Sequence, residues 1–365
     1  MKHSRAFILA EQLLTIMLQA GFILVLCGSF YQLTSFYANI NQVLTARNHA
    51  ERVISFVDDK IRHAGLGLWR CGSPATIRAR LDKISRLRTS QLTPSSPRRG
   101  YRLPISLLCK SDGLNVVPEA SSPRIDGDAL VLLYARSDND LNMTFTTTTP
   151  FNRINDTSGN AAITLIDDDN DNNKSEFVEV TDTSYSNIRR WAVTESIGMP
   201  FYVSNINYPN VDVFFYGTDS VRLPETIDIP NAGELMYLDC MQMFVGKDEE
   251  MGWQFKFRRL KDDGTEWGAT YNQEIGILEI YMELDTTNNI FTLYVLASGG
   301  ENQGVSYPRP ESWPKEANPA GEGATDAAKE ADAKAKWLAS DYCHHIVYVS
   351  RASWKLNNLE GFSWN

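Results

Sequence analysis

Residues 7–31 read FILAEQLLTIMLQAGFILVLCGSFY, and this run is uncharged except for Glu11. It is long enough to span a bilayer, because about 20 apolar residues suffice. A carboxylate in bilayer hydrocarbon is unfavourable by about 2.5–3.5 kcal/mol on insertion scales, so such a residue marks a functional site with a partner. If the chain is cut after Ala6, the new α-amino group of Phe7 is a cation, and a neighbouring copy can present its own amine to Glu11.

Other N-terminal segments share this hydrophobicity. An ordinary secretory signal has a shorter apolar region and ends at a small-residue cleavage site, and no such site follows this run. Leu26 precedes Cys27, where a lipoprotein signal needs a small residue. A plain single-pass anchor remains an alternative, since it explains the hydrophobicity but not Glu11.

The pattern after the apolar run is that of an amphipathic helix. No proline occurs between Phe7 and Ala64. Apolar residues recur at steps of three and four, at Ile40, Val43, Leu44, Ala50, Val53, Ile54, Val57, Ile61 and Ala64. We therefore expect one helix over 7–64, roughly 87 Å long at 1.5 Å per residue. Its first half should project and its second half should pack on a sheet, with Gly65 or Gly67 as the terminator.

Later segments alternate with the period of β-strands. Strands are predicted at 128–134, 211–216, 235–245 and 346–349, and residues 277–284 form a hairpin with 291–295. Within that hairpin Leu278, Ile280, Met282 and Leu284 should share one face. The predicted class is α+β, with one long N-terminal helix followed by antiparallel sheet.

The N-terminus resembles that of type IV prepilins and of the pseudopilins of type II secretion. Those proteins have a short basic leader, a small residue before the cut, a phenylalanine that becomes N-methylated and a glutamate at the fifth mature position. Ala6, Phe7 and Glu11 occupy these three positions here, with Ala6 where glycine is usual. The resemblance implies processing at Ala6 and Phe7, and assembly through Phe7 and Glu11.

Four later segments are similar to PilW-like minor pilins. They are the IRHAG of 61–65 followed by Cys71-Gly72, GDALVLLY at 127–134, LDCMQMFVG at 238–246 and SWKLNN at 353–358. The resemblance implies a pilin-like fold, divided into a leader (1–6), a transmembrane and assembly helix (7–36), an amphipathic half that packs on the head (37–68) and a β-rich head (69–365). Insertions are expected near 89–104 and 307–341. Within the second, residues 324–339 should form a surface helix, with Trp313 and Trp337 either holding it down or lining a contact surface.

The implied function is that of a minor pilin, a structural subunit of a tip or priming complex that initiates pilus assembly and can present an adhesin. The alternatives are a J-type minor pseudopilin of type II secretion and a membrane-anchored binding module unrelated to pili. Expected partners are other minor pilins and the major pilin through the N-terminal helix, a prepilin peptidase, the inner-membrane assembly platform and a tip adhesin. The head would lie in the periplasm before assembly, on a single inner-membrane span, and at the pilus tip or cell surface afterwards.

Cysteines outside the apolar run would then lie where disulfides persist. They are Cys71, Cys109, Cys240 and Cys343, and four cysteines allow three connectivities. Their order along the chain favours Cys71–Cys109 and Cys240–Cys343. Zinc is the competing interpretation, but no C-x-x-C spacing occurs.

No cofactor is expected, apart from calcium as an alternative. The acidic run 166–176 offers hard oxygen ligands from Asp167, Asp169, Asp171 and Glu176. It lacks the glycine at the sixth position of an EF-hand loop, and a solvated acidic turn is the other interpretation. The sequence contains no G-x-S-x-G, Walker A or H-E-x-x-H motif, so no enzyme is predicted. The net charge of −10 argues against generic nucleic-acid binding, so no nucleic acid is predicted as a partner.

Overall fold

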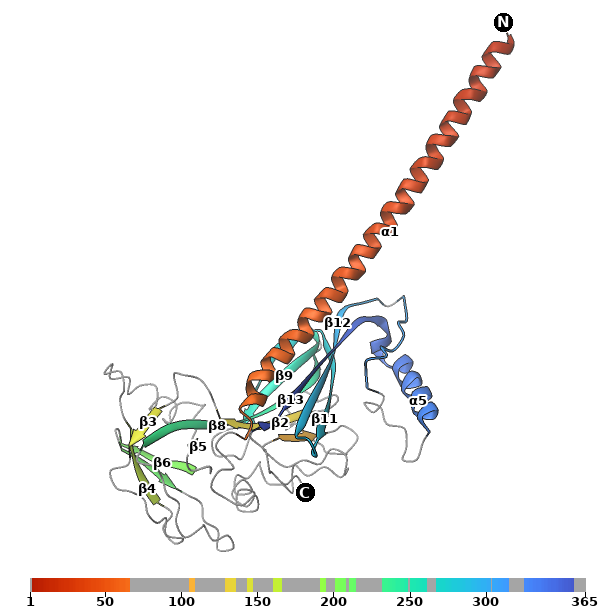
Figure 1. The fold of residues 1–365 in the computed structure, drawn as a ribbon. Coiled ribbons are helices and arrows are strands. Elements are labelled where there is room, and N and C mark those ends of the chain that lie inside the picture. Colours follow the sequence, from red (N-terminus) through yellow and green to blue (C-terminus); the bar gives the residue numbers. More distant parts are fainter. Residues whose placement is uncertain are drawn as a thin grey trace.

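The protein consists of one long helix and antiparallel sheets, as seen in a computed structural model (Figure 1). The structure describes residues 2–65, 105–108, 129–135, 143–146, 160–165, 191–194, 201–207, 210–214, 232–248, 250–260, 267–302, 304–314 and 325–357. The expected insertion at 89–104 lies outside these residues. The α+β class predicted from the sequence is confirmed.

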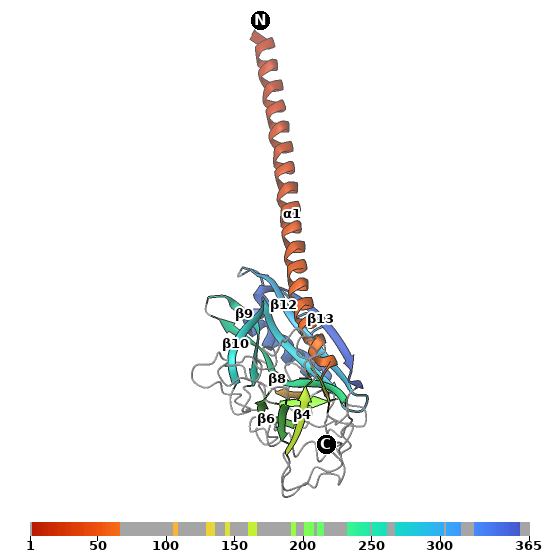
Figure 2. The ribbon, with the colours of Figure 1, turned by 90° about the vertical axis from the view of Figure 1, so that its left-hand side faces the viewer.

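Helix α1 runs unbroken from Lys2 to Arg62. Its 61 residues correspond to a length of roughly 90 Å. Gly65 follows the helix with a φ of 74°, a left-handed conformation that glycine adopts without strain and that commonly ends helices. The predicted continuous helix is therefore confirmed. Its first half projects away from the rest of the molecule, and its second half lies over β12 and β13 (Figure 2).

Ten strands belong to one antiparallel sheet. They are β1 (Ile105–Leu108), β2 (Ala129–Ala135), β3 (Met143–Thr146), β4 (Asn160–Leu165), β5 (Trp191–Thr194), β6 (Phe201–Asn207), β7 (Asn210–Phe214), β8 (Ala232–Asp248), β9 (Gly252–Leu260) and β10 (Trp267–Ile275). A second sheet contains β11 (Ile277–Asp285), β12 (Ile290–Glu301) and β13 (His345–Lys355), in that order. The strands expected at 128–134, 211–216, 235–245 and 346–349 correspond to β2, β7, β8 and β13.

Strand β8 takes part in two pairing systems. Its first half pairs with β3 and β5, and the strand order β8-β3-β4-β7-β6-β5 closes on itself because β5 also pairs with β8. Its second half pairs with β2 and β9, starting where Leu238 lies opposite Ala135 at the end of β2. Strands β3 to β7 and the first half of β8 thus form a closed ring of strands. In the chain, this ring lies between β2 and the second half of β8. Figure 1 shows β3, β4 and β6 on the opposite side of the molecule from the C-terminal helix α5.

Gly276 joins the two sheets. It is the only residue between β10 and β11, and its φ is 69°. Its N–H donates to the carbonyl of Trp253 at 2.8 Å, and its carbonyl accepts from the N–H of Ser298 at 2.7 Å. The backbone therefore passes from one sheet into the other at a glycine corner, and α1 contacts β10 and β12 beside that corner.

The main core lies between α1 and both sheets. The helix contributes a single buried face, formed by Ala46, Ala50, Val53, Val57 and Ile61 at steps of three and four residues. These side chains are at most 2% exposed, and they pack on Leu130, Met243, Phe255, Val295 and others from the sheets. This arrangement is the one predicted for the second half of the helix, and burial of this face is the main source of its attachment.

The hairpin formed by β11 and β12 is confirmed, but the predicted facing is wrong for Leu278. A register shift between Ile277 and Glu279 places an extra residue in β11. Such a β-bulge reverses the sides to which successive residues point. Ile280 and Met282 therefore lie in the main core, whereas Leu278 lies on the opposite face of the sheet with Tyr281.

That opposite face is covered by the segment between β12 and β13. It contains the helix α5 (Asp326–Ala339), whose N-cap Thr325 accepts from the N–H of Ala328, and the short 3-10 helix η5 (Asp341–His344). Trp313 and Trp337 are 1% and 2% exposed and pack with Leu278. The expected surface helix is present, and of the two roles considered for the tryptophans, holding the helix down is the one observed.

Candidate functional site: the projecting helix and its junction with the head

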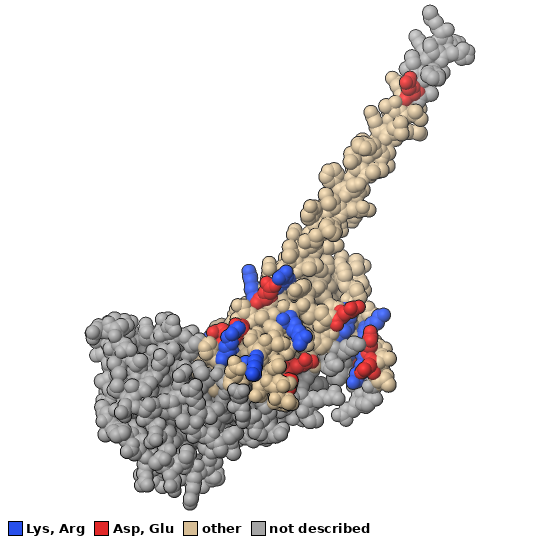
Figure 3. Space-filling model, in the orientation of Figure 1, with Lys and Arg blue, Asp and Glu red and all other residues tan. Residues whose placement is uncertain are grey.

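The projecting part of α1 carries almost no charge (Figure 3). No Asp, Glu, Lys or Arg occurs between Glu11 and Arg47. Its large apolar side chains are exposed, from Leu13 (52%) to Leu44 (48%). The hydroxyls of Thr15, Ser29 and Thr34 donate to the carbonyl four residues earlier, at 2.8–2.9 Å. These polar groups are satisfied within the helix, as a hydrocarbon surrounding requires.

Within the described part of the chain, this is the one helix that is long and apolar enough to cross a membrane. Glu11 lies on it as an exposed residue. The backbone of Ala6 and Phe7 continues the same helix, while their side chains lie outside what the structure describes. Phe7 and Glu11, the residues predicted from the sequence to act in assembly, therefore lie on a straight apolar helix, near the end that is farthest from the head.

Helix and head are joined by polar contacts on either side of the buried helical face. The Nδ1 atom of His49 lies within hydrogen-bonding distance of a carboxylate oxygen of Glu274 in β10, and their side chains are only 15% and 9% exposed. Arg52 lies 3.6 Å from the same carboxylate. On the other side, the indole N–H of Trp354 in β13 donates to Asp58. These contacts fix the rotation of α1 about its own axis.

The Nε–H group of Arg62, one turn later on the helix, is shared between the two carboxylate oxygens of Asp58, at 2.9 Å from each. The hydrogen bond from Arg62, with smaller contributions from Trp354 and from the charge of Arg62, lowers the pKa of the Asp58 carboxyl below its usual value, while burial opposes that shift. Asp58 is therefore ionised at neutral pH and can accept hydrogen bonds from Arg62 and Trp354 at the same time.

Two glycines permit the closest approach of α1 to β12. A Cβ atom on Gly299 would lie 1.7 Å from the carbonyl oxygen of Gln42, and one on Gly300 would lie 3.0 Å from the Gln42 amide nitrogen. Real Cβ contacts essentially never fall below 3.0 Å. Any side chain at Gly299 would therefore push the helix away from the sheet at the point where it leaves the head.

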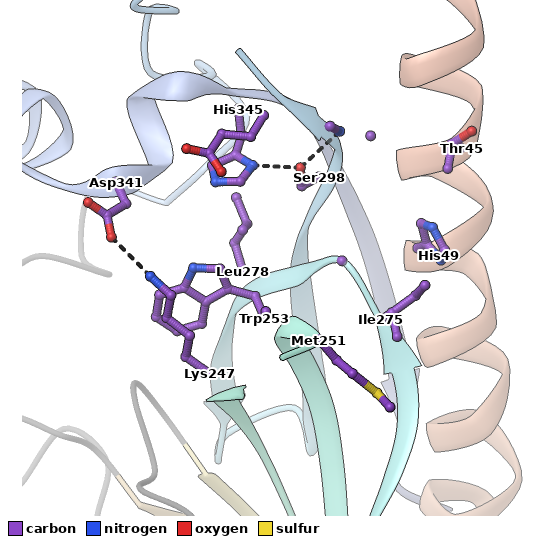
Figure 4. A pocket seen from close by; sticks show the side chains of 15 residues that line it. Thr45, His49, Lys247, Met251, Trp253, Ile275, Leu278, Ser298, Asp341 and His345 are labelled. Atoms are coloured by element: carbon purple, nitrogen blue, oxygen red, sulfur yellow. Dashed lines mark hydrogen bonds and ion pairs between the residues drawn. The ribbon is translucent and has the colours of Figure 1, made fainter. Parts of the chain in front are cut away.

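A pocket of about 350 Å³ opens beside this junction, where the two sheets meet (Figure 4). Its apolar lining residues are Met251, Trp253, Ile275 and Leu278, and its charged lining residues are Lys247, Glu301 and Asp341. His345 also lines it, with its Nδ1 2.8 Å from the hydroxyl oxygen of Ser298. Burial lowers the pKa of His345, and the neighbouring carboxylates of Glu301 and Asp341 oppose that shift.

The predicted Cys240–Cys343 disulfide is wrong, because both residues are free thiols. Cys240 lies on β8 opposite Leu133, whereas Cys343 lies in η5 among the side chains that pack around Trp313 and Trp337. The two cysteines belong to separate packed regions, and a disulfide needs their Cα atoms within about 7 Å. Cys71 and Cys109 lie outside the described residues.

The predicted calcium ligands Asp167, Asp169, Asp171 and Glu176 also lie outside the described residues. Among the residues that are described, no group of three or more His, Cys, Asp or Glu side chains is arranged to hold a metal ion.

Sequence reasoning missed two features of the junction, the His49–Glu274 pair and the pocket. Each joins residues more than 45 positions apart, so no local spacing indicates them. The only available signal was His49, a histidine next to the apolar positions of an amphipathic helix. Comparisons of the chain with protein-family models, with curated proteins and with solved structures found no significant match.

Proposed function

We propose that this protein is a minor pilin, a structural subunit that joins a pilus tip or priming complex through its N-terminal helix. The observation that carries the proposal is Glu11, an isolated carboxylate near the far end of a projecting apolar helix. A head that holds such a helix by polar contacts on both sides of its buried face is suited to presenting it to neighbours in one orientation.

The energetics of Glu11 support an assembly role. The carboxylate is unfavourable in hydrocarbon by about 2.5–3.5 kcal/mol, which corresponds to roughly two orders of magnitude in an equilibrium. After cleavage behind Ala6, a neighbour's Phe7 amine would supply the compensating charge inside the membrane. A buried charge is tolerated when it is paired and hydrogen-bonded, so pairing would fix the axial register of the two helices.

The length of the apolar surface supports lateral contacts as well. The exposed apolar side chains extend from Leu13 to Leu44, a distance of about 45 Å at 1.5 Å per residue. The hydrocarbon core of a bilayer is about 30 Å thick. The excess, which includes Tyr37, Ile40 and Val43, would face water in an isolated subunit, and burial against neighbouring helices removes that cost.

A pseudopilin of type II secretion is the second candidate, because the same helix would serve both systems. A plain anchored binding module is the third, and it requires no cleavage. Mass spectrometry of the N-terminal peptide from protein isolated from its native cell separates the third from the others. A peptide that begins with N-methylated Phe7 is expected, and an intact Met1 in functional protein would overturn the proposal.

The pairing role is tested by Glu11→Gln, with Glu51→Gln as the matched control on the same helix. Glu51 is half-exposed and pairs with Arg47. We expect Glu11→Gln to reduce co-purification with the other pilus subunits at least tenfold and Glu51→Gln to leave it unchanged. Unchanged co-purification of Glu11→Gln would refute the pairing. Deletion that stops exoprotein release, with piliation intact, would instead favour the pseudopilin.

A further inference from the structure

The pocket at the glycine corner has a chemical character that the proposed function does not use. Its lining comes from α1, from the two sheets (β8 to β13) and from the 3-10 helix η5. Gly252, Gly276 and Gly300 line it with positive φ angles. A concave site of this size with an apolar floor and a few polar groups is typical of small-ligand sites.

One wall of the pocket already holds an ammonium group. The Nζ atom of Lys247 lies 5.5 Å from the ring centroid of Trp253 and 3.3 Å from a carboxylate oxygen of Asp341 (Figure 4). An aromatic face together with a carboxylate is the combination that recognises organic cations. The chain thus places its own alkylammonium group in a position where an external one would be favourable.

This internal ammonium can be displaced. The side chains of Lys247 and Asp341 are 51% and 71% exposed. Ion pairs between exposed side chains contribute about 0–1 kcal/mol, so little is lost when Lys247 turns outward into water. An incoming ammonium group would then take over both the Trp253 ring and the Asp341 carboxylate.

The remaining charges favour a cation over other ligands. Two carboxylates, Asp341 and Glu301, line the pocket against one ammonium group. In the part of the chain that the structure describes, Glu301 forms no ion pair. His345 lies beside Glu301, and burial lowers the pKa of His345, which favours the neutral imidazole. This side chain therefore adds no positive charge to the pocket. The pocket is therefore suited to a positively charged ligand with an aliphatic stem that can lie along the partly exposed ring of Trp253.

We propose that this pocket binds an alkylammonium group, supplied either by a free aliphatic amine or by a lysine side chain of another protein. Lys247 occupies the position in the unbound protein and competes with the ligand. The inference goes beyond the proposed function and does not depend on it, because it concerns the head alone.

The test is isothermal titration calorimetry on the full-length chain in detergent micelles. The probes are cadaverine for a free amine, Nα-acetyl-lysine methylamide for a protein lysine, and pentane-1,5-diol as the uncharged analogue of cadaverine. We expect cadaverine to bind and the diol not to bind. Binding should weaken with added salt, because the pocket is open to solvent. Binding of both amines would indicate that a protein lysine is accepted, and binding of cadaverine alone would indicate a free amine.

Variants at exposed positions identify the site. Lys247→Ala should bind cadaverine about fivefold more tightly, because its competing ammonium is gone. Asp341→Asn and Glu301→Gln should each weaken binding about fivefold. Glu311→Gln, which removes an exposed carboxylate that does not line the pocket, should have no effect. Equal binding of the diol, or a Lys247→Ala protein that keeps its melting temperature and binds no more tightly than wild type, would overturn the proposal.

Discussion

Substitution of Gly299 by alanine tests how closely α1 is seated on the head. The added Cβ would lie 1.7 Å from the carbonyl oxygen of Gln42, where at least 3.0 Å is needed. That oxygen is part of the helix backbone, so it cannot rotate away as a side chain can. Accommodation requires α1 to lift from β12 by roughly 1 Å or more, or β12 to bend by a similar amount.

The expected loss of stability follows from this displacement. Inserting a methyl group into a well-packed contact costs about 1–3 kcal/mol. The lower conformational entropy of alanine in the unfolded chain offsets about 0.4–1 kcal/mol of that loss. The net loss of about 1–2 kcal/mol should lower the melting temperature of the head by about 2–8 °C.

Thermal unfolding of the full-length chain in micelles, followed by near-UV circular dichroism, measures this change. Gly304→Ala is the matched control, because its Cβ would meet only Asn302 Oδ1, at 3.8 Å. Trypsin cleavage of α1 at Arg47 and Arg52 gives a second readout, since a lifted helix exposes its backbone more often. If Gly299→Ala melts and is cleaved like Gly304→Ala, the close packing of α1 on β12 is refuted.

Three further predictions concern other parts of the molecule. Trp337→Ala should destabilise the packing of α5 by about 3–5 kcal/mol and speed its proteolysis, whereas Leu338→Ala, at a residue 52% exposed, should change little. Asp58→Asn should lower stability at neutral pH by less than about 1 kcal/mol. Because the folded pKa of Asp58 is lowered, its contribution is complete above the usual carboxyl pKa and is lost as the pH falls through the folded value, so the variant should also show a smaller loss of stability in acid. Cys240 and Cys343 should resist iodoacetamide in the native protein and react after unfolding without reductant, since both thiols are free and buried.

Each of these has an outcome that contradicts it. Trp337→Ala and Leu338→Ala that are equally resistant to proteolysis would show that Trp337 does not hold α5. An Asp58→Asn variant with the acid-unfolding profile of wild type would remove the linkage to Asp58. Peptides of Cys240 and Cys343 that are alkylated only after reduction would reveal a disulfide.

The elements that could be predicted are those encoded by local patterns. The length of α1 follows from an unbroken helical periodicity without proline, and the end of the helix follows from Gly65. The turn between β11 and β12 is equally local, because Asp285 accepts from the N–H groups of Thr287 and Asn288 and Asn289 takes a φ of 53°. In each case the residues that determine the structure are within a few positions of one another.

The rest depends on contacts between distant residues. The bulge after Ile277 moves Leu278 to the other face of its sheet, and no alternation of apolar residues reveals an inserted position. The glycine corner at Gly276 joins Trp253 to Ser298, which no spacing indicates. For the candidate site, Glu11 was found because a charge in an apolar run is a local anomaly. The pocket was not found because its lining is gathered from eight elements that are distant in the sequence.

The pairing of Ala135 with Leu238 makes the closed ring of strands a replaceable module. The chain leaves the α1-bearing sheet at the end of β2 and re-enters it directly opposite, so a tight turn can substitute for residues 136–237 while β2 and β8 remain hydrogen-bonded. An engineered chain could therefore carry a different domain between Ala135 and Leu238, with the helix and its contacts with the sheets unchanged.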